Sequence, residues 1–228
     1  MNYDSVPLRD FKELNDWETV IFVYQSALKQ VETKIDILNG EFQHRHKYNP
    51  IEHVKSRIKT PESIVKKLKR HGYESSIENM VRYVNDIAGI RISCSFTSDI
   101  YLIADMISKQ NDLTILARRD YMKNPKKSGY RSYHMLVTTP VFLSDSIIDT
   151  KVEIQIRTVA QDFWATLEHK MHYKFEGDGP DYITKELREC ARYVAELDTR
   201  MEELNNEIQK YGKSVSYTHL RAHETLMN

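Results

Sequence analysis

The sequence predicts an α/β (α+β) protein with a mixed sheet of about five strands, flanking helices and a long helix near each terminus. Near both ends, apolar residues recur every three or four positions, as they do on one face of a helix. Two inner segments, 88–96 and 151–158, instead alternate apolar and polar residues, as strands with one buried face do. The 228 residues are enough for one domain with a sizeable core.

The first helices are expected before residue 85. Segment 17–43 repeats apolar residues at helical spacing: Val20, Val23, Ala27, Val31, Ile35 and Leu38. A second helix is expected to begin at Thr60 and Pro61, because threonine suits the N-cap and proline suits the first helical position. Gly72 is expected just past the end of this helix. Segment 77–84 is predicted to be a short third helix.

The central part of the chain changes to a period of two. In segment 88–96, Ile90, Ile92 and Cys94 fall on one face and Arg91 on the other, which predicts a strand. A helix follows it, and further strands are expected near 113–117, over 132–139 and over 151–158. Segment 159–173 is then predicted to be helical.

Segment 183–211 has the most regular helical pattern in the chain. Its apolar residues alternate spacings of three and four, as in a heptad repeat: Leu187, Cys190, Val194, Leu197, Met201, Leu204, Ile208 and Tyr211. A narrow apolar seam of this kind needs a partner. That partner is either the N-terminal helix of the same chain or another subunit, and the pattern leaves both alternatives open.

We divide the chain into four parts. Residues 1–53 are an N-terminal helical region, 54–175 the domain that carries the chemistry, and 176–213 a C-terminal helix for packing or oligomerisation. The heptad pattern stops after Gly212, and stretch 215–225 resembles one reading frame of a transposon-type sequencing adaptor. We therefore interpret residues 214–228 as a non-native tail.

The amino-acid composition limits the classes of function that the chain can have. Lysine plus arginine equal aspartate plus glutamate, at 33 each, so net charge gives no reason to expect a general nucleic-acid or membrane binder. Cys94 and Cys190 lie in apolar patterns and are interpreted as reduced core thiols. No apolar run approaches the roughly 20 residues that span a bilayer, and the first residues contain no signal-peptide pattern. We expect a cytoplasmic protein with no membrane partner.

Local charge is uneven and points to small anionic ligands. The Lys126–His134 run combines cations, a glycine, two tyrosines and a histidine. Cations attract phosphate, and aromatic rings stack on bases. A second basic segment places Ser63 and Lys67 on one helix face, with Arg57 and Lys59 just before the positive end of the helix dipole. The alternative for each segment is a solvated basic surface.

Two carboxylates complement these basic segments. Asp86 precedes the strand at 88–96, and Glu153 shares a polar strand face with Gln155 and Arg157. Carboxylates from different elements can hold Mg²⁺, which completes its shell with phosphate and water oxygens. The alternative is that Glu153 simply pairs with Arg157 across the strand surface.

Several sequence motifs occur together in a fixed order. They are Arg57-Ile58-Lys59, Asp86-Ile87-Ala88-Gly89-Ile90-Arg91, the Lys126–His134 run, Glu153-Ile154-Gln155-Ile156-Arg157-Thr158, and Trp164 with Glu168-His169. In these motifs the chain resembles the synthetase domain of the RelA/SpoT family. The short length and the lack of a hydrolase region resemble the small alarmone synthetases, and the Lys126–His134 run is most similar to the RelP type.

This resemblance implies a nucleotidyltransferase-like fold and a specific reaction. The reaction is transfer of pyrophosphate from ATP to the 3′-hydroxyl of GDP or GTP, with release of AMP. The resemblance also implies Mg²⁺ as cofactor and a homo-oligomer, a tetramer, while RNA binding is left open. The alternative from another class is a catalytically silent nucleotide- or RNA-binding regulator of the same fold.

The resemblance also implies a role for individual residues. Asp86 and Glu153 would hold Mg²⁺ and carry the catalysis, with Glu153 as the base on the attacking hydroxyl. The residues implied to bind ATP are Arg57, Lys59, Ser63, Lys67 and Arg91, the two arginines lying against adenine. Those implied to bind GDP or GTP are Arg119, Lys126, Tyr130, His134 and Gln155, with Tyr130 stacked on guanine. Many relatives have asparagine at Ser128 and lysine at Arg119, and both replacements keep hydrogen bonding or charge.

Overall fold

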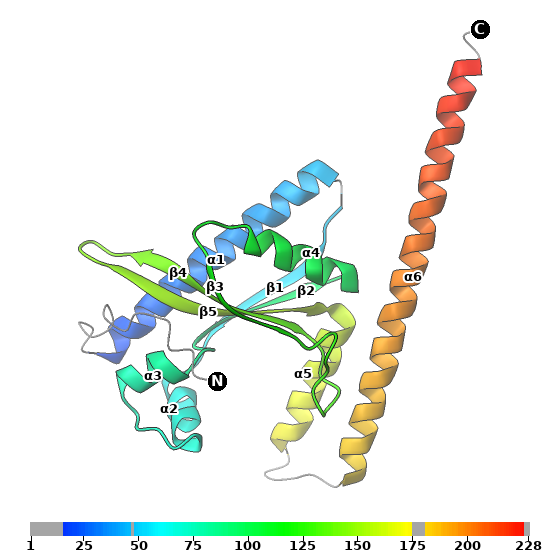
Figure 1. The fold of residues 1–228 in the computed structure, drawn as a ribbon. Coiled ribbons are helices and arrows are strands. Elements are labelled where there is room, and N and C mark those ends of the chain that lie inside the picture. The colour runs from blue at the N-terminus through cyan, green and yellow to red at the C-terminus, as the bar shows by residue number, and fades with distance from the viewer. Residues whose placement is uncertain (1–15, 47, 175–180, 226–228) are drawn as a thin grey trace.

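The computed structural model describes residues 16–46, 48–174 and 181–225, which form a twisted sheet with helices packed around it (Figure 1). Five strands lie in the order β1-β2-β5-β4-β3. Their bounds are β1 Ile51–Ile58, β2 Ala88–Cys94, β3 Thr114–Asp120, β4 Tyr133–Phe142 and β5 Ile147–Thr158. The central pair β2–β5 is parallel and the other pairs are antiparallel. The predicted mixed sheet is confirmed.

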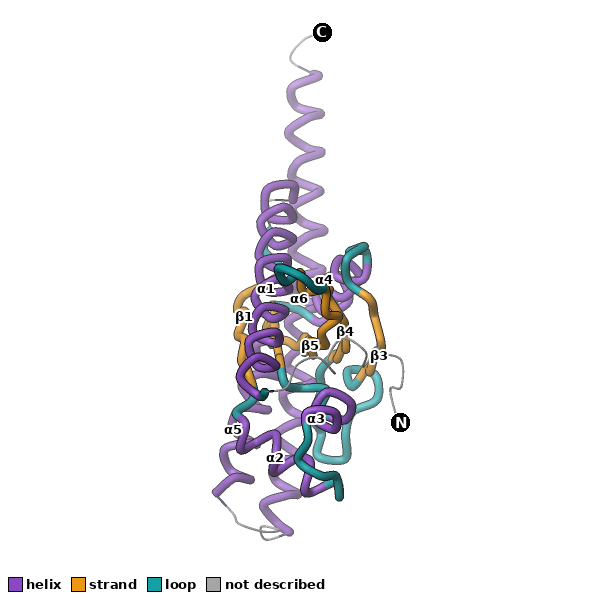
Figure 2. The backbone as a smooth tube through the Cα atoms, turned by 90° about the vertical axis from the view of Figure 1, so that its left-hand side faces the viewer, coloured by secondary structure: helices purple, strands orange, loops and turns teal. Residues whose placement is uncertain are grey.

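Helices occupy most of the positions that the sequence predicts. They are α1 Trp17–His46, α2 Pro61–Arg70, α3 Ile77–Tyr83, α4 Thr97–Ser108, α5 Val159–Lys174 and α6 Asp181–Thr225. The two longest, α1 and α6, lie near the two ends of the chain, as expected (Figure 2). Within the described ranges, no helix has the length and apolarity needed to cross a membrane.

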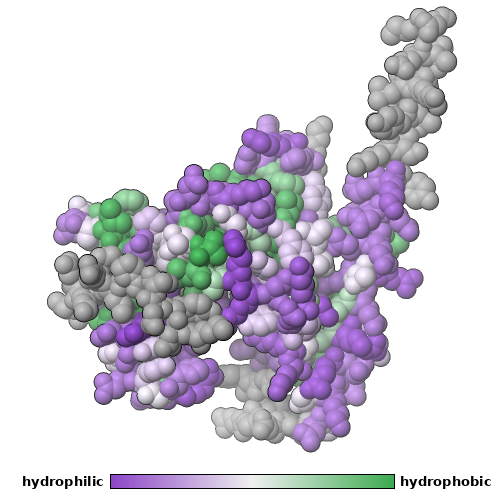
Figure 3. All heavy atoms as spheres, viewed as in Figure 1, coloured by the Kyte–Doolittle hydropathy of each residue, from purple (hydrophilic) through white to green (hydrophobic). Residues whose placement is uncertain are grey.

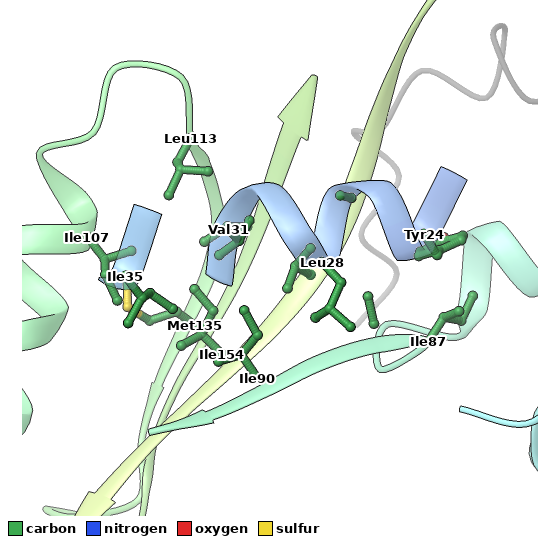
Figure 4. Close-up of a cluster of buried hydrophobic side chains, with 14 of the residues drawn as sticks. Tyr24, Leu28, Val31, Ile35, Ile87, Ile90, Ile107, Leu113, Met135 and Ile154 are labelled. Atoms are coloured by element: carbon green, nitrogen blue, oxygen red, sulfur yellow. The ribbon is translucent and has the colours of Figure 1, made fainter. Parts of the chain in front are cut away.

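The hydrophobic core lies between α1 and one face of the sheet. Figure 4 shows Leu28 and Val31 of α1 directed toward strand residues that include Ile90 and Ile154. The side chains of Val31 and Ile154 are 1% and 0% exposed. Burying one such aliphatic side chain contributes roughly 1.5–3 kcal/mol relative to leaving it in water. Because this face of the sheet is filled, the polar positions of β2 and β5 point to the opposite face.

The strand β1 was not predicted from the sequence. It is an edge strand of which only Ile51 is buried, so its side chains do not show the alternation that marks a half-buried strand. It begins at Ile51, three residues before the predicted start of the chemical domain at 54. Its antiparallel pairing with β2 places Arg57 opposite Gly89, beside the polar face of the sheet.

The start and end of α2 agree with the signals in the sequence. The Thr60 hydroxyl accepts a hydrogen bond from the Ser63 N–H at 3.4 Å, and Pro61 is the first helical residue. Past the other end, Gly72 has a φ of 76°, a left-handed conformation that suits glycine. The Lys59 N–H bonds to the Ile87 carbonyl at 2.8 Å, which ties the entry of α2 to the start of β2.

Helix α6 packs on α5 and α4 rather than along α1, so the intramolecular alternative suggested by the heptad pattern was wrong. The Trp164 indole N–H donates to the Leu187 carbonyl at 3.0 Å. Farther along α6, the Asp198 carboxylate accepts from the Thr158 hydroxyl at 2.8 Å and the Gln161 amide at 2.9 Å. These contacts attach α6 to the junction between β5 and α5.

The heptad seam of α6 is divided between two environments. Leu187 and Val194 are partly covered, whereas the later apolar members Leu197, Met201, Leu204 and Ile208 are exposed. Cys190 lies in the same seam and is exposed, in contrast to the buried Cys94, so its interpretation as a core thiol was wrong. In Figure 3 most of the described surface of α6 is hydrophilic. The backbone of α6 stays helical to residue 225, past Gly212, and its last turns project away from the sheet (Figure 1).

Two isoleucines on α1 test the packing of the core. Ile35 is 2% exposed and Ile37 is 64% exposed. Replacing Ile35 with alanine leaves a cavity and should lower the free energy of unfolding by about 2–5 kcal/mol. The matched change Ile37→Ala should stay within about 0.5 kcal/mol of the original protein. Urea unfolding followed by circular dichroism measures both values, and equal losses would contradict the described burial of α1.

Candidate active site

The polar face of the central strands forms the floor of the site. Glu153, Gln155 and Arg157 alternate along β5 with buried apolar residues, so all three point away from α1. In the parallel register, Glu153 lies opposite Gly89 and Gln155 opposite Arg91. Because Gly89 has no side chain and a Cβ there would meet nothing within 4 Å, the floor beside Glu153 stays open.

Two hollows meet over this floor. The first has a volume of about 210 Å³, and its lining includes Arg57, Arg91 and Gln155. The second has a volume of about 160 Å³, and its lining includes Lys67, Arg119 and His134. Both hollows are also lined by the same two carboxylates, Asp86 and Glu153. A group bound in one hollow can therefore meet a group bound in the other beside these carboxylates.

Asp86 is held by two lysines. Its carboxylate oxygens accept hydrogen bonds from Lys59 at 2.8 Å and from Lys67 at 2.7 Å. Burial alone would raise the pKa of Asp86, but the two charged hydrogen bonds outweigh it and hold the pKa below its usual range. Asp86 is therefore ionised at neutral pH and is held by both lysines.

Lys151 supports the segment before β2 and was not singled out from the sequence. Its side chain is 2% exposed, and its amine donates to the Asn85 amide oxygen at 2.8 Å and to the Arg82 carbonyl at 3.3 Å. Burial lowers the pKa of Lys151 to about 8. In the sequence this lysine occupies a polar position of a strand, which usually indicates a solvated side chain. Here it anchors the residue next to Asp86.

A ring of contacts surrounds Glu153. Its carboxylate lies 3.4 Å from His134 Nδ1 and accepts from the Gln155 amide at 2.9 Å. His134 Nε2 lies 2.9 Å from the Tyr130 hydroxyl, and Arg157 donates to the side-chain amide oxygen of Gln155 at 3.2 Å. Burial would raise the pKa of Glu153, but the hydrogen bonds from His134 and Gln155 hold it below its usual range. The carboxylate is thus ionised and fixed in orientation.

The Lys126–His134 run places Tyr130 at one side of these contacts around Glu153. The Lys126 ammonium lies 4.7 Å from the centre of the Tyr130 ring, and the Arg157 guanidinium carbon lies 5.7 Å from it. Gly129 has a φ of 91° and lies so close to α6 that an added Cβ would be 2.5 Å from the Ala191 Cβ. The run is therefore fixed against α6 by a contact that only glycine permits.

The structure brings most of the predicted site residues together, although not all of them line a hollow. Those that line one or both hollows are Arg57, Lys67, Asp86, Arg91, Arg119, His134, Glu153 and Gln155. Lys59 contacts the shared carboxylate of Asp86, Tyr130 lies beside His134, and Lys126 lies over the Tyr130 ring. Ser63 is exposed at the start of α2, where its hydroxyl bonds to that of Thr60 at 3.0 Å.

Arg157 is the main site residue that sequence reasoning left without a role. It is 2% exposed, and its ion pair is with Asp162 at 3.4 Å, not with Glu153 as the structural alternative supposed. Burial is the main cause that lowers the pKa of Arg157, and the charges of Arg91 and Arg57 lower it further. The sequence did not reveal this environment, because Arg157 lies on β5 and its partner Asp162 lies on α5, and no fixed spacing joins a strand residue to a helix residue.

The donors at the junction of the hollows fit a hard cation. Asp86 and Glu153 offer carboxylate oxygens only, which are the ligands that Mg²⁺ prefers. Among the described residues, no group of three or more histidine, cysteine, aspartate or glutamate side chains is placed to hold a metal ion. An ion at this junction would therefore take its remaining ligands from phosphate and water.

Comparison with known proteins gives one consistent answer. Residues 56–178 match the family described as "Region found in RelA / SpoT proteins". The chain is 45% identical over 195 residues to GTP pyrophosphokinase YwaC of Bacillus subtilis (strain 168), a match that covers 86% of this chain and 93% of that protein.

Two solved structures from Bacillus subtilis agree with this match. Small alarmone synthetase 2 has a TM-score of 0.76 at 44% identity and covers 84% of this chain and 99% of its own. Small alarmone synthetase 1 bound to its product pppGpp has a TM-score of 0.79 at 34% identity and covers 85% of this chain and 98% of its own. The predicted family, fold and class of enzyme are confirmed, and the chain belongs to the RelA/SpoT family as a small alarmone synthetase.

Proposed function

We propose that this chain transfers a pyrophosphate group from ATP to the 3′-hydroxyl of GDP or GTP and releases AMP. The observation that carries the proposal is the position of Asp86 and Glu153, which line both hollows. A reaction between two nucleotides needs two binding sites that meet at the reacting atoms. Membership of a family with GTP pyrophosphokinases supports the choice of this reaction.

The first hollow suits ATP. Arg57 and Arg91 come from neighbouring strands and can lie on the two faces of an adenine ring, which their planar guanidinium groups favour. Lys59 and Lys67 both hold Asp86, which lines both hollows, and the triphosphate would extend toward this junction. Ser63 stands at the N-terminus of α2, whose dipole favours the negative charge of phosphate.

The second hollow suits the guanosine nucleotide. Arg119 in its lining offers positive charge to the acceptor phosphates. Tyr130, which contacts His134 of this lining, offers a ring for stacking on guanine, and Lys126 above that ring adds positive charge. His134 bridges Tyr130 and Glu153, so it links the base-binding side to the reacting side. Gln155 fixes the Glu153 carboxylate from the neighbouring position of the same strand.

The chemistry follows from the position of Glu153. The acceptor 3′-oxygen attacks the β-phosphorus of ATP, a new O–P bond forms, and the bond to the α-phosphate oxygen breaks as AMP leaves. Glu153 accepts the proton of the attacking hydroxyl, since its carboxylate is ionised and held by two neighbours. Lys59 and Lys67 balance the charge that spreads over the transferred phosphates.

Mg²⁺ is part of the proposal. Asp86 and Glu153 would hold the ion, and when bound it would neutralise phosphate charge on the transferred group. A homotetramer is also proposed, and the exposed apolar stripe of Leu197, Met201 and Leu204 on α6 supports association. A cytoplasmic location stays a prediction.

Replacing Glu153 tests the base. Glu153→Gln keeps the volume and removes the charge, so we expect kcat to fall by about 10²–10⁴-fold with little change in melting temperature. The exposed Glu189, which pairs with Arg192, gives the control variant Glu189→Gln with near-normal turnover. The assay mixes ATP labelled at the β-phosphate with GDP and Mg²⁺ and separates the products. Label that reaches guanosine 3′-pyrophosphate at a normal rate in Glu153→Gln would exclude Glu153 as the base, whereas label found only in ADP with the original protein would reject the reaction.

Metal removal tests the cation. With EDTA present we expect no turnover, and added Mg²⁺ should restore it. Asp86→Asn should raise the Mg²⁺ concentration needed for half-maximal rate, because one of the two carboxylates is lost. Full activity after exhaustive chelation would refute the Mg²⁺ assignment.

Two further variants separate the nucleotide sites. Tyr130→Ala should raise the KM for GDP by about 5–150-fold, the range expected for a lost base–aromatic stack, and leave the KM for ATP nearly unchanged. Arg57→Ala should raise the KM for ATP and leave the KM for GDP nearly unchanged. Steady-state kinetics with one nucleotide varied at saturating levels of the other measures both, and a Tyr130→Ala variant impaired only toward ATP would reverse the assignment of the hollows.

A further inference from the structure

Asp162 lies between two arginines that belong to different parts of the site. One of its carboxylate oxygens, Oδ1, is 3.4 Å from Arg157 Nε and 3.6 Å from Arg91 Nη1. The Asp162 side chain is 15% exposed, Arg157 2% and Arg91 32%. Asp162 is in the first turn of α5, which leaves the end of β5, so its position is fixed by the strand that carries Glu153.

The two arginines lead to the two nucleotide sites. Arg91 lines the first hollow, which we assign to ATP. Arg157 lies against the ring of Tyr130, which we assign to the guanosine nucleotide, and its Nη2 donates to Gln155. A single carboxylate oxygen therefore lies between the arginine of one base-binding side and the arginine of the other.

The contact between Asp162 and the two arginines is not fully hydrogen-bonded. Three buried atoms, Arg91 Nε, Arg157 Nε and Asp162 Oδ1, have no hydrogen-bond partner among the described residues. The two ion-pair distances are longer than the 2.7–2.9 Å or so of a charged N–H···O bond. Buried polar groups without partners are unfavourable, so a small inward shift of either arginine would be favourable.

We propose that Asp162 is a positioning residue that couples the two nucleotide sites, so that ATP and the guanosine acceptor bind cooperatively. A base stacked on Arg91 restricts that guanidinium and orders the Asp162 carboxylate. The ordered carboxylate then holds Arg157 against Tyr130, so the second nucleotide meets a site that is already arranged. The inference rests on the proposed function, because it uses the assignment of the two hollows.

The test measures binding rather than turnover. Calorimetry gives the Kd of GDP with Mg²⁺, alone and with saturating AMPCPP, a non-hydrolysable ATP analogue. For the original protein we expect AMPCPP to tighten GDP binding by about fivefold or more, within the usual range of coupling between sites. By linkage, GDP should tighten AMPCPP binding by the same factor.

Asp162→Asn should remove this coupling. The variant keeps the shape of the side chain and loses its charge, so we expect the factor to fall below about twofold. Asp162→Glu keeps the charge and should retain a measurable part of the coupling. Should Asp162→Asn fail to fold, Asp162→Ser removes the carboxylate with a smaller side chain and is expected to give the same loss.

Asp198→Asn is the matched control. Asp198 is another carboxylate beside α5, but its hydrogen bonds go to Thr158 and Gln161. We expect this variant to keep the coupling of the original protein even where its melting temperature falls. A general loss of stability around α5 would instead reduce coupling in both variants and would overturn the inference.

Two other results would overturn it without touching the proposed function. One is independent binding of GDP and AMPCPP to an original protein that turns over normally. The other is unchanged coupling in a folded Asp162→Asn variant. Failure of the original protein to bind either nucleotide would be a different result, since it would reject the proposed function as well.

Discussion

The parallel pairing of β2 with β5 is the interaction on which the site depends. Alternation along β5 directs Ile154 into the core under α1 and Glu153 to the opposite face, so a one-residue slip would exchange them. The same register puts Gly89 beside Glu153 and Arg91 beside Gln155. The hydrophobic core therefore sets the position of the Glu153 carboxylate, because any change that shifts β5 against β2 moves Ile154 and Glu153 together.

The site gathers charged side chains where burial makes their charge unfavourable, and bound substrates can offset this loss of free energy. Asp86 takes two lysines as partners, and Glu153 takes His134 and Gln155, so both carboxylates stay ionised although burial opposes this. Such pairs contribute little net stability when desolvation is counted. In the proposed reaction, phosphate oxygens would replace Asp86 as partners of the lysines and leave its carboxylate free for a cation.

Sequence patterns predicted the parts of this arrangement that depend on local chemistry. Alternation found β2 and β5, and capping found the limits of α2 at Thr60 and Gly72. Edge strand β1 was missed because its exposed side chains do not alternate. The Asp162 contacts were missed because they join a helix to two strands, and no fixed spacing connects those elements. The order of the motifs predicted which residues lie in one region of the fold, but not which side chains are in direct contact.

Helix α6 shows why a local pattern can be correct and still incomplete. The heptad seam identified a helix, but only part of the seam is covered. Polar contacts, which the spacing of apolar residues does not record, also fix the position of α6. Those contacts bring Ala191 against Gly129, where no other residue fits without displacement. Since Gly129 precedes Tyr130, the position of the tyrosine depends on how α6 is seated. A helix outside the hollows thus helps to set the position of Tyr130.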